Sequence, residues 1–260
     1  MSGIQGFDIL PVTDGPIADP HIVGIYDTRE SRDFRVAGEF VRDQMSGLSD
    51  ANLIGADSSI LEFILDLPSR PVCLTVSGKR INGLVSWADL QKLPARAAIF
   101  GLITGFEISM ADAIRKRFPE DGGWLSQLSC DRRDKLCEQI MESHENDSVV
   151  DALLCTQFCD KSTIVCKSLQ LGESRRRLEK RCGQIEDLRD RVAHANNYSA
   201  SREGAHRLAR TLNDLLELRD SLVAIQKPLP ELVLIPNLSN SAAESRFWPS
   251  RTGCRDRSEN

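Results

Sequence analysis

The sequence predicts an α+β protein in which a small α/β unit precedes an all-helical bundle. Runs typical of β-strands lie between residues 22 and 86, whereas apolar residues recur at helical spacing from residue 95 to residue 226. With 260 residues, the chain is long enough for two small domains, each with its own core. We therefore divide it into an irregular N-terminal arm at 1–50, an α/β unit at 51–94, a helical bundle at 95–226 and a mostly disordered tail at 227–260.

In the N-terminal arm, only one or two short elements are expected, such as a strand at 22–26. The α/β unit is predicted from a helix at 60–65, which follows the capping side chains of residues 57–59. Two strands at 72–76 and 81–86 follow, and a second helix starts in the segment after them.

Five helices are predicted in the bundle, and short breaks separate them. They cover 97–114, 124–144, 149–159, a stretch from 175 toward 194, and 205–225. Ser174 is the expected N-cap of the fourth helix. Glu107 lies inside the apolar first helix, so its carboxylate needs a partner, for which Arg189 or a helix terminus is a candidate. In the tail, 232–235 is apolar enough for one docked strand.

Composition limits the classes of function. The formal net charge of −5 argues against a broadly basic nucleic-acid coat, so any RNA contact must be local. The N-terminus does not resemble a secretory signal, and no apolar run reaches the length of a membrane span, so we expect a cytoplasmic protein without membrane contact. Cys155 and Cys159 have helical i,i+4 spacing but lack a second ligand pair, which favours buried free thiols over a metal site. No metal site is predicted.

A first candidate site follows the second predicted strand, at Gly83, Ser86 and Asp89. The Ser86 hydroxyl and the amides of the next helix can meet a phosphate, and Asp89 can accept hydrogen bonds from two ribose hydroxyls. Gly83 allows close approach of the backbone. The alternative is that Ser86 and Asp89 only cap the following helix, because S-x-x-D is also a capping pattern.

The segment from Gly83 to Asp89 and the order of elements around it resemble one CBS repeat, a module that binds adenosine nucleotides. The resemblance implies ATP, ADP or AMP as a regulatory ligand. CBS repeats normally work in pairs, and residues 1–50 lack a second G-x-x-S-x-x-D motif. A single repeat leaves half of a sandwich exposed, so the resemblance implies pairing with a second subunit.

A second candidate site lies near the end of the fourth bundle helix, at Arg189, Asp190 and His194. Histidine can move a proton near neutral pH, and an arginine can offset charge that develops on a phosphate. Arg189 and His194 are separated by about 140° around an α-helix, so one chain does not present them on one face. The alternative is an ordinary surface pair on a charged helix.

Arg189-Asp190-Arg191-Val192-Ala193-His194 matches the Arg-(Asn/Asp/His)-x-x-x-His signature of HEPN-domain ribonucleases. That resemblance implies dimerisation around a shared cleft and RNA cleavage to a 2′,3′-cyclic phosphate without a metal or another cofactor. It also implies that Asp190 holds the Arg189 guanidinium or tunes His194. The family's toxin branch often has a tyrosine two residues after the histidine, where this chain has Asn196.

A run of basic residues precedes this motif and is the candidate strip for RNA phosphates. It consists of Arg175, Arg176, Arg177, Lys180 and Arg181. The alternative is a solvated helix face, which is the usual meaning of such a run.

Together, the two segments resemble a bacterial family in which a CBS repeat is fused to a HEPN domain. The resemblance implies a homodimeric ribonuclease that acts as a toxin or as a defence or stress effector, with an antitoxin or defence-system partner. Two alternatives are a non-catalytic dimeric module that senses a nucleotide and binds RNA or protein, and a scaffold with neither activity.

Overall fold

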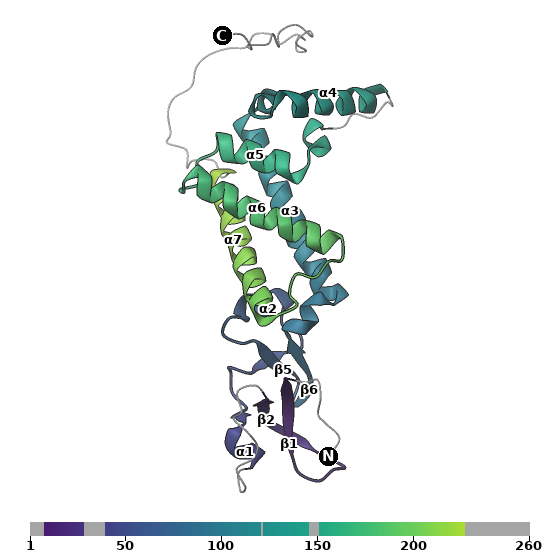
Figure 1. Cartoon of the computed structure of the whole chain (residues 1–260), viewed down its shortest axis with the longest axis vertical. Helices are drawn as coiled ribbons and strands as arrows, with labels where there is room; N and C mark the ends of the chain where they lie inside the picture. Colours follow the sequence, from purple (N-terminus) through teal and green to yellow (C-terminus); the bar gives the residue numbers. More distant parts are fainter. Residues whose placement is uncertain (1–7, 29–39, 121, 146–150, 227–260) are drawn as a thin grey trace, which may run out of the picture. The chain divides into compact units, whose positions relative to one another are not determined.

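The structure is a computed structural model, which describes residues 8–28, 40–120, 122–145 and 151–226. It confirms a mixed α+β protein, with two three-stranded sheets followed by long helices (Figure 1). The predicted tail at 227–260, including the run at 232–235, lies outside the described residues.

The N-terminal part is more regular than predicted. Strands β1 (Ile9–Asp14), β2 (His21–Asp27) and β3 (Ser46–Gly47) form an antiparallel sheet in that order, and a short helix, α1 (Val41–Gln44), precedes β3. The sequence predicted one or two short elements here and located only the strand that corresponds to β2. The sequence gives little sign of β3 because that strand has two residues and pairs with the distant Gly24 and Ile25.

The α/β unit contains the predicted helix and hairpin and one further strand. Its elements are β4 (Leu53–Gly55), α2 (Ile60–Asp66), β5 (Val72–Ser77) and β6 (Arg80–Ser86). Strand β4 is parallel to β5, and β6 is antiparallel to β5. The Ser59 side chain accepts a hydrogen bond from the Leu61 amide at 3.2 Å, as expected for the N-cap of α2. After β6 the chain forms a 3-10 helix, η1 (Trp87–Gln91), rather than the start of the long helix.

Neighbouring residues of a strand point to opposite sides of its sheet. Consecutive residues at the start of β5 are buried, so both of its faces are covered there. Cys73 belongs to the large cluster that includes the helices, whereas Leu74 packs in a smaller cluster with Ile25 of β2. The N-terminal sheet therefore contributes to covering the face of the α/β sheet that the single-repeat argument left exposed. This packing removes one of the reasons for expecting a second subunit.

The bundle begins with α3 (Leu93–Arg117) and ends with α6 (Arg175–Ala193) and α7 (Arg202–Gln226), close to the predicted first, fourth and fifth helices. The second predicted helix is divided into η2 (Gly123–Gln127) and α4 (Cys130–Glu145).

The prediction of a third helix at 149–159 is wrong in its position. That stretch contains a 3-10 turn, η3 (Ala152–Cys155), and the helix α5 spans Phe158–Ser168. A capping box between Gln157 and Asp160 starts α5, so Cys155 and Cys159 lie on separate elements and not on one helix. Both cysteines are partly buried free thiols, and Cys155 packs against the apolar core, as expected for a core-facing thiol.

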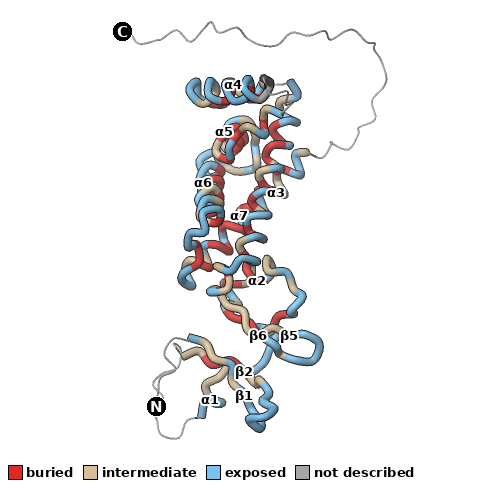
Figure 2. The backbone as a smooth tube through the Cα atoms, turned by 90° about the vertical axis from the view of Figure 1, so that its right-hand side faces the viewer, coloured by how far each residue is buried: buried red, intermediate tan, exposed pale blue. Residues whose placement is uncertain are grey.

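One apolar cluster connects the α/β unit to the bundle, instead of two separate cores. It includes Phe63 and Leu67 from the α/β unit, Ile99 and Phe106 from α3, and Leu212 from α7. Buried positions follow the facing sides of α3, α6 and α7 in Figure 2. The described residues up to 226 therefore pack as one compact unit, and the boundary expected near residue 94 lies within a shared core.

Helix α3 is apolar enough, by length and composition alone, to cross a membrane, with a mean hydropathy of 1.5 over its most apolar window. The prediction that no apolar run reaches the length of a membrane span is therefore wrong for this helix. The helix nevertheless contacts α5, α6 and α7, and Ile99, Ile103 and Phe106 are buried there. Buried positions make up 39% of that apolar window.

Candidate functional site

The segment that carries His194 closes the C-terminal end of α6. His194 is the C-cap, and Ala195 follows with a left-handed φ of 55°. The Asn196 amide donates to the Arg191 carbonyl at 2.9 Å, and the Ala195 amide donates to the Val192 carbonyl at 3.4 Å. This is the Schellman arrangement, in which glycine usually occupies the left-handed position. The helix therefore ends at the motif, with the His194 residue exposed to solvent.

Arg189 lies five residues earlier, with about a third of its side chain exposed (36%). Its Nη1 pairs with Oδ1 of the neighbouring Asp190 at 3.3 Å. Its Nε lies 4.0 Å from Oε2 of Glu107 on α3, so Arg189 is one of the partners expected for that carboxylate. Because Arg189 and His194 are five residues apart along α6, they do not lie on one face of the helix.

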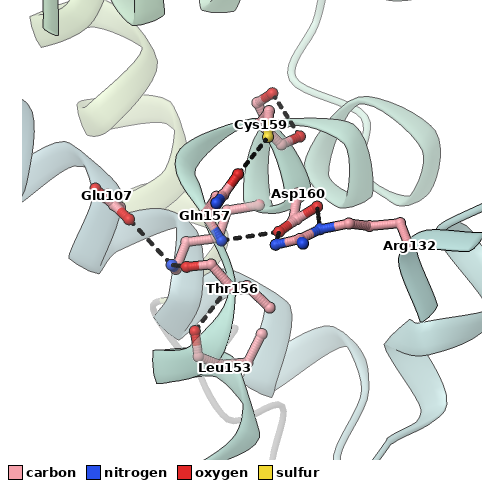
Figure 3. A network of polar contacts seen from close by, with 9 residues as sticks. Glu107, Arg132, Leu153, Thr156, Gln157, Cys159 and Asp160 are labelled. Carbon is pink, nitrogen blue, oxygen red and sulfur yellow. Dashed lines mark hydrogen bonds and ion pairs between the residues drawn. The ribbon is translucent and has the colours of Figure 1, made fainter. Parts of the chain in front are cut away.

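Glu107 also belongs to a buried polar network behind the motif (Figure 3). Its Oε1 accepts from Nζ of Lys161 at 3.0 Å, and the same ammonium donates to the Thr156 carbonyl at 2.7 Å. The Lys161 side chain is 6% exposed. Because a buried ammonium is costly without partners, Glu107 and the Thr156 carbonyl account for its position.

Asp160 binds Arg132 in a two-point ion pair, with distances of 2.8 Å and 2.7 Å between nitrogen and oxygen atoms. Burial alone would raise the pKa of Asp160, but the hydrogen bonds from Arg132 and from the Gln157 amide outweigh it and hold the pKa below its usual range. The pKa of Glu186, on the motif helix, is raised by burial and then by the negative charge of Asp190. Fixed charges of both signs thus lie behind Arg189.

A second polar network, which the sequence did not predict, binds the backbone carbonyls at the end of α6. The Arg96 guanidinium donates to the carbonyls of Arg191 and Val192 at 3.2 Å and 2.9 Å, and to the Asn196 carbonyl at 3.3 Å. It also lies 5.0 Å from the centre of the Tyr198 ring. No sequence motif surrounds Arg96, so its role becomes visible only from its contacts between α3 and the end of α6.

Gln91, the last residue of η1, extends this network. Its Nε2 donates to Oδ1 of Asn197 and to Oγ of Ser199, both at 2.9 Å. Its Oε1 accepts from Nη2 of Arg96 at 3.2 Å, and the Tyr198 hydroxyl donates to the Leu90 carbonyl. The end of the α/β unit is therefore hydrogen-bonded directly to the segment after His194.

The Ser86–Asp89 pair forms the capping box that was weighed against nucleotide binding. Oδ2 of Asp89 accepts from the Ser86 amide at 2.7 Å and from the Ser86 hydroxyl at 3.2 Å, while Oδ1 pairs with Lys92 at 2.6 Å. Burial would raise the pKa of Asp89, but Lys92 and the Ser86 amide together lower it. Gly83 packs against Thr75, since a Cβ there would lie 2.6 Å from the Thr75 hydroxyl. A ribose at this position would have to replace the cap contacts.

The basic strip is smaller than predicted, and Arg181 does not belong to it. Its side chain is 10% exposed and pairs with Glu173 at 2.9 Å, Asp214 at 2.8 Å and Glu217 at 2.7 Å. Arg181 faces the bundle interior because it is on the side of α6 that carries Leu178 and Ile185. This position corrects its assignment as a residue that contacts RNA.

The four remaining basic residues of the strip, Arg175, Arg176, Arg177 and Lys180, are exposed on the first two turns of α6. Arg175 pairs with Glu179 at 2.8 Å, and Arg177 pairs with Glu173 at 3.1 Å. Arg176 and Lys180 are four residues apart and therefore share one side of the helix. These two are the strongest candidates for phosphate contacts.

Comparison of the chain with protein-family models, with curated proteins and with solved structures gives no match.

Proposed function

We propose that this protein is a metal-independent endoribonuclease of the HEPN type, in which Arg189 and His194 act on RNA. The proposal rests on one observation: the helix that carries the motif ends at His194, which leaves that histidine exposed, and Arg189 on the same helix is partly exposed. The exposed Arg176 and Lys180 on the same helix would hold the RNA backbone. Such local binding suits a chain whose overall charge is negative.

In this reaction the 2′-hydroxyl attacks the neighbouring phosphorus, and the bond to the 5′-oxygen of the next nucleotide breaks. His194 would take the proton from the 2′-hydroxyl or supply one to the leaving oxygen, a type of help worth about 10²–10⁴ in rate. Arg189 would offset the charge on the pentacoordinate phosphorus. The products are a 2′,3′-cyclic phosphate and a 5′-hydroxyl, and no redox step is involved.

The test is incubation of the full chain with RNA in the presence of EDTA. We expect the wild type to cut, and we expect His194→Ala and Arg189→Ala to lose cleavage by about 10² or more. His21→Ala and Arg191→Ala are matched controls, because His21 is an exposed histidine elsewhere and Arg191 has similar exposure two residues further along α6. Full activity in His194→Ala, or cutting that requires a metal, would contradict the mechanism.

The second copy that HEPN chemistry requires would bind the exposed side of α3, so we propose a homodimer. Leu93, Phe100 and Ile108 are exposed on this helix, with relative exposures of 76%, 42% and 57%. At Gly101 and Gly105 an added Cβ would meet nothing within 4 Å, so contacts within the chain do not explain why glycine is used. A mid-helix glycine costs about 1 kcal/mol relative to alanine, and close approach of another helix would offset that cost.

Light scattering of the wild type and of Gly101→Leu tests the dimer. We expect a dimer for the wild type and a monomer for Gly101→Leu, which stays folded because the space beside Gly101 is open within one chain. Gly183→Leu is the matched control, since Gly183 also lies within a long helix and has open space around it. A monomeric wild type would remove the shared cleft.

An adenosine nucleotide, as ATP, ADP or AMP, is the proposed regulatory ligand at Gly83, Ser86 and Asp89. A cytoplasmic location, and an antitoxin or defence-system partner, complete this proposal. They rest on the family resemblance.

A non-catalytic module that senses a nucleotide and binds RNA or a protein is the second candidate. It is favoured by the position of Arg189, which pairs with Asp190 and faces Glu107 instead of pointing freely to solvent. A gel-shift assay separates the two: a binding module retains RNA but gives no cleaved product even as wild type.

A further inference from the structure

We infer that Arg96 positions the segment that carries His194, and that Gln91 connects this segment to the Ser86–Asp89 cap. The inference rests on the proposed function only where it concerns RNA cleavage. Its other measurements apply whether or not the protein is a ribonuclease.

The first step concerns the end of α6, whose last carbonyls have no partner within the helix. The carbonyls of Arg191 and Val192 each accept one hydrogen bond from the turn that follows the helix, and the planar Arg96 guanidinium gives each a second one and also reaches the Asn196 carbonyl. A positive charge is also favourable at the negative end of a helix dipole. Arg96 therefore fixes the backbone on both sides of His194 from a different helix.

The second step concerns Ala195, which adopts a left-handed backbone conformation with φ of 55°. This conformation is unfavourable for residues with a Cβ atom, so surrounding contacts must maintain it. The contacts of Arg96 before and after Ala195 supply that constraint. Without them, the turn at Ala195 is less stable, and the orientation of the His194 side chain changes when the turn is lost.

The third step links the turn to the α/β unit. Asp89 and Gln91 belong to the same five-residue 3-10 helix, and Asp89 holds its start through the Ser86 amide. Gln91 at its end donates to Asn197 and Ser199 and accepts from Arg96. A ligand that takes the Asp89 carboxylate away from the cap would disturb η1, and Gln91 would transmit the disturbance to the His194 segment.

Hydrogen exchange of the full chain tests the positioning role. We expect Arg96→Gln to increase the exchange of amides in 194–199 about tenfold or more, because it loses charge-assisted hydrogen bonds to three carbonyls. Arg117→Gln is the matched control, since Arg117 is on the same helix and also stacks on an aromatic ring, that of Phe118. Unchanged exchange in Arg96→Gln would overturn the inference.

The imidazole NMR signals provide a second readout, because the chain has only four histidines and His194→Ala assigns the relevant one. We expect Arg96→Gln to shift the His194 signal, and Arg96→Lys to restore it only in part. A lysine keeps the charge but lacks the fork that reaches several carbonyls at once. Full restoration by lysine would mean that charge alone matters, which contradicts positioning by the fork.

The link to the cap is tested without a ligand. Asp89→Ala should raise exchange in 194–199 and shift the His194 signal, and Gln91→Ala should do the same even if Arg96→Gln fails to fold. Ser59→Ala is the control, because it removes a helix cap of similar kind at α2 instead of at η1. If Asp89→Ala behaves like Ser59→Ala, the link does not exist.

RNA cleavage is the third readout. If the wild type cleaves RNA, Arg96→Gln should lower kcat by a larger factor than it changes KM, because the residues proposed to bind phosphate are unchanged. If the wild type does not cleave, the proposed function fails, while the exchange and NMR results still decide the positioning role.

Discussion

The two candidate sites both lie at helix ends, but the folded chain uses their side chains differently. At the start of η1, both carboxylate oxygens of Asp89 are occupied by Ser86 and Lys92. At the end of α6, the backbone around His194 is held by Arg96, while the histidine itself remains exposed. A motif residue whose polar atoms already stabilise the fold must give up those contacts to bind a ligand. An exposed one is free to react, so the second site is the better candidate for chemistry.

The same contrast between a residue that stabilises the fold and an exposed one is largest within the basic strip, between Arg181 and Arg176. Arg181→Ala should lower the free energy of unfolding by about 3 kcal/mol, because it leaves three carboxylates without their shared cation. Arg176→Ala should change it by less than about 0.5 kcal/mol, as an exposed surface residue, but should weaken RNA binding. Urea unfolding and a gel shift measure the two effects. Equal stability of both variants would contradict the assignment of Arg181 to the fold.

The second comparison uses pH and the buried ion pair of Asp160. Its pKa is lowered in the folded state, so its contribution to stability is present above the unfolded pKa of about 3.9 and is lost as the pH falls through the folded value. Asp160→Asn should therefore cost about 2 kcal/mol at neutral pH, and the difference from wild type should shrink below about pH 4. The control is Asp187→Asn, an exposed pair with Arg191 that should show almost no difference at either pH.

The smallest expected effect concerns the cap itself. Asp89→Ala should lower stability by about 1 kcal/mol, the usual cost of losing a helix cap, and the protein should remain folded. If a nucleotide binds there, ATP should raise the Tm of the wild type and not that of Asp89→Ala. Equal shifts in the two proteins would place the nucleotide elsewhere and leave Ser86 and Asp89 as a cap only.

Much of the fold could be predicted from the sequence, because long apolar helices and the hairpin β5–β6 carry strong local patterns. Strands β3 and β4 could not, since each is two or three residues long and depends on pairing with a distant strand. The helix α5 was placed too early because the apolar pattern continues through η3, where only the Gln157–Asp160 capping box shows the break.

The candidate site was predictable in part. The sequence correctly predicted that the motif lies at the end of a helix and that Ser174 is the N-cap of that helix. It also predicted that Glu107 lies close to Arg189. Arg96 and Lys161 could not be found, because their roles depend on contacts between helices far apart in the chain. The burial of Arg181 was missed for a related reason: in a run of charges, only the position relative to Leu178 and Ile185 separates the inner side from the outer.

The apolar cluster that joins α2 and β5 to the bundle has a consequence for how this architecture can change. Because Phe63 and Leu67 pack in the same core as Leu212, the α/β unit cannot be exchanged for another sensor as an independent cassette without exposing apolar surface. Substitutions on one side of that junction must be accommodated on the other. The two parts are therefore expected to unfold in a single cooperative transition and to be inherited together, not shuffled separately among proteins.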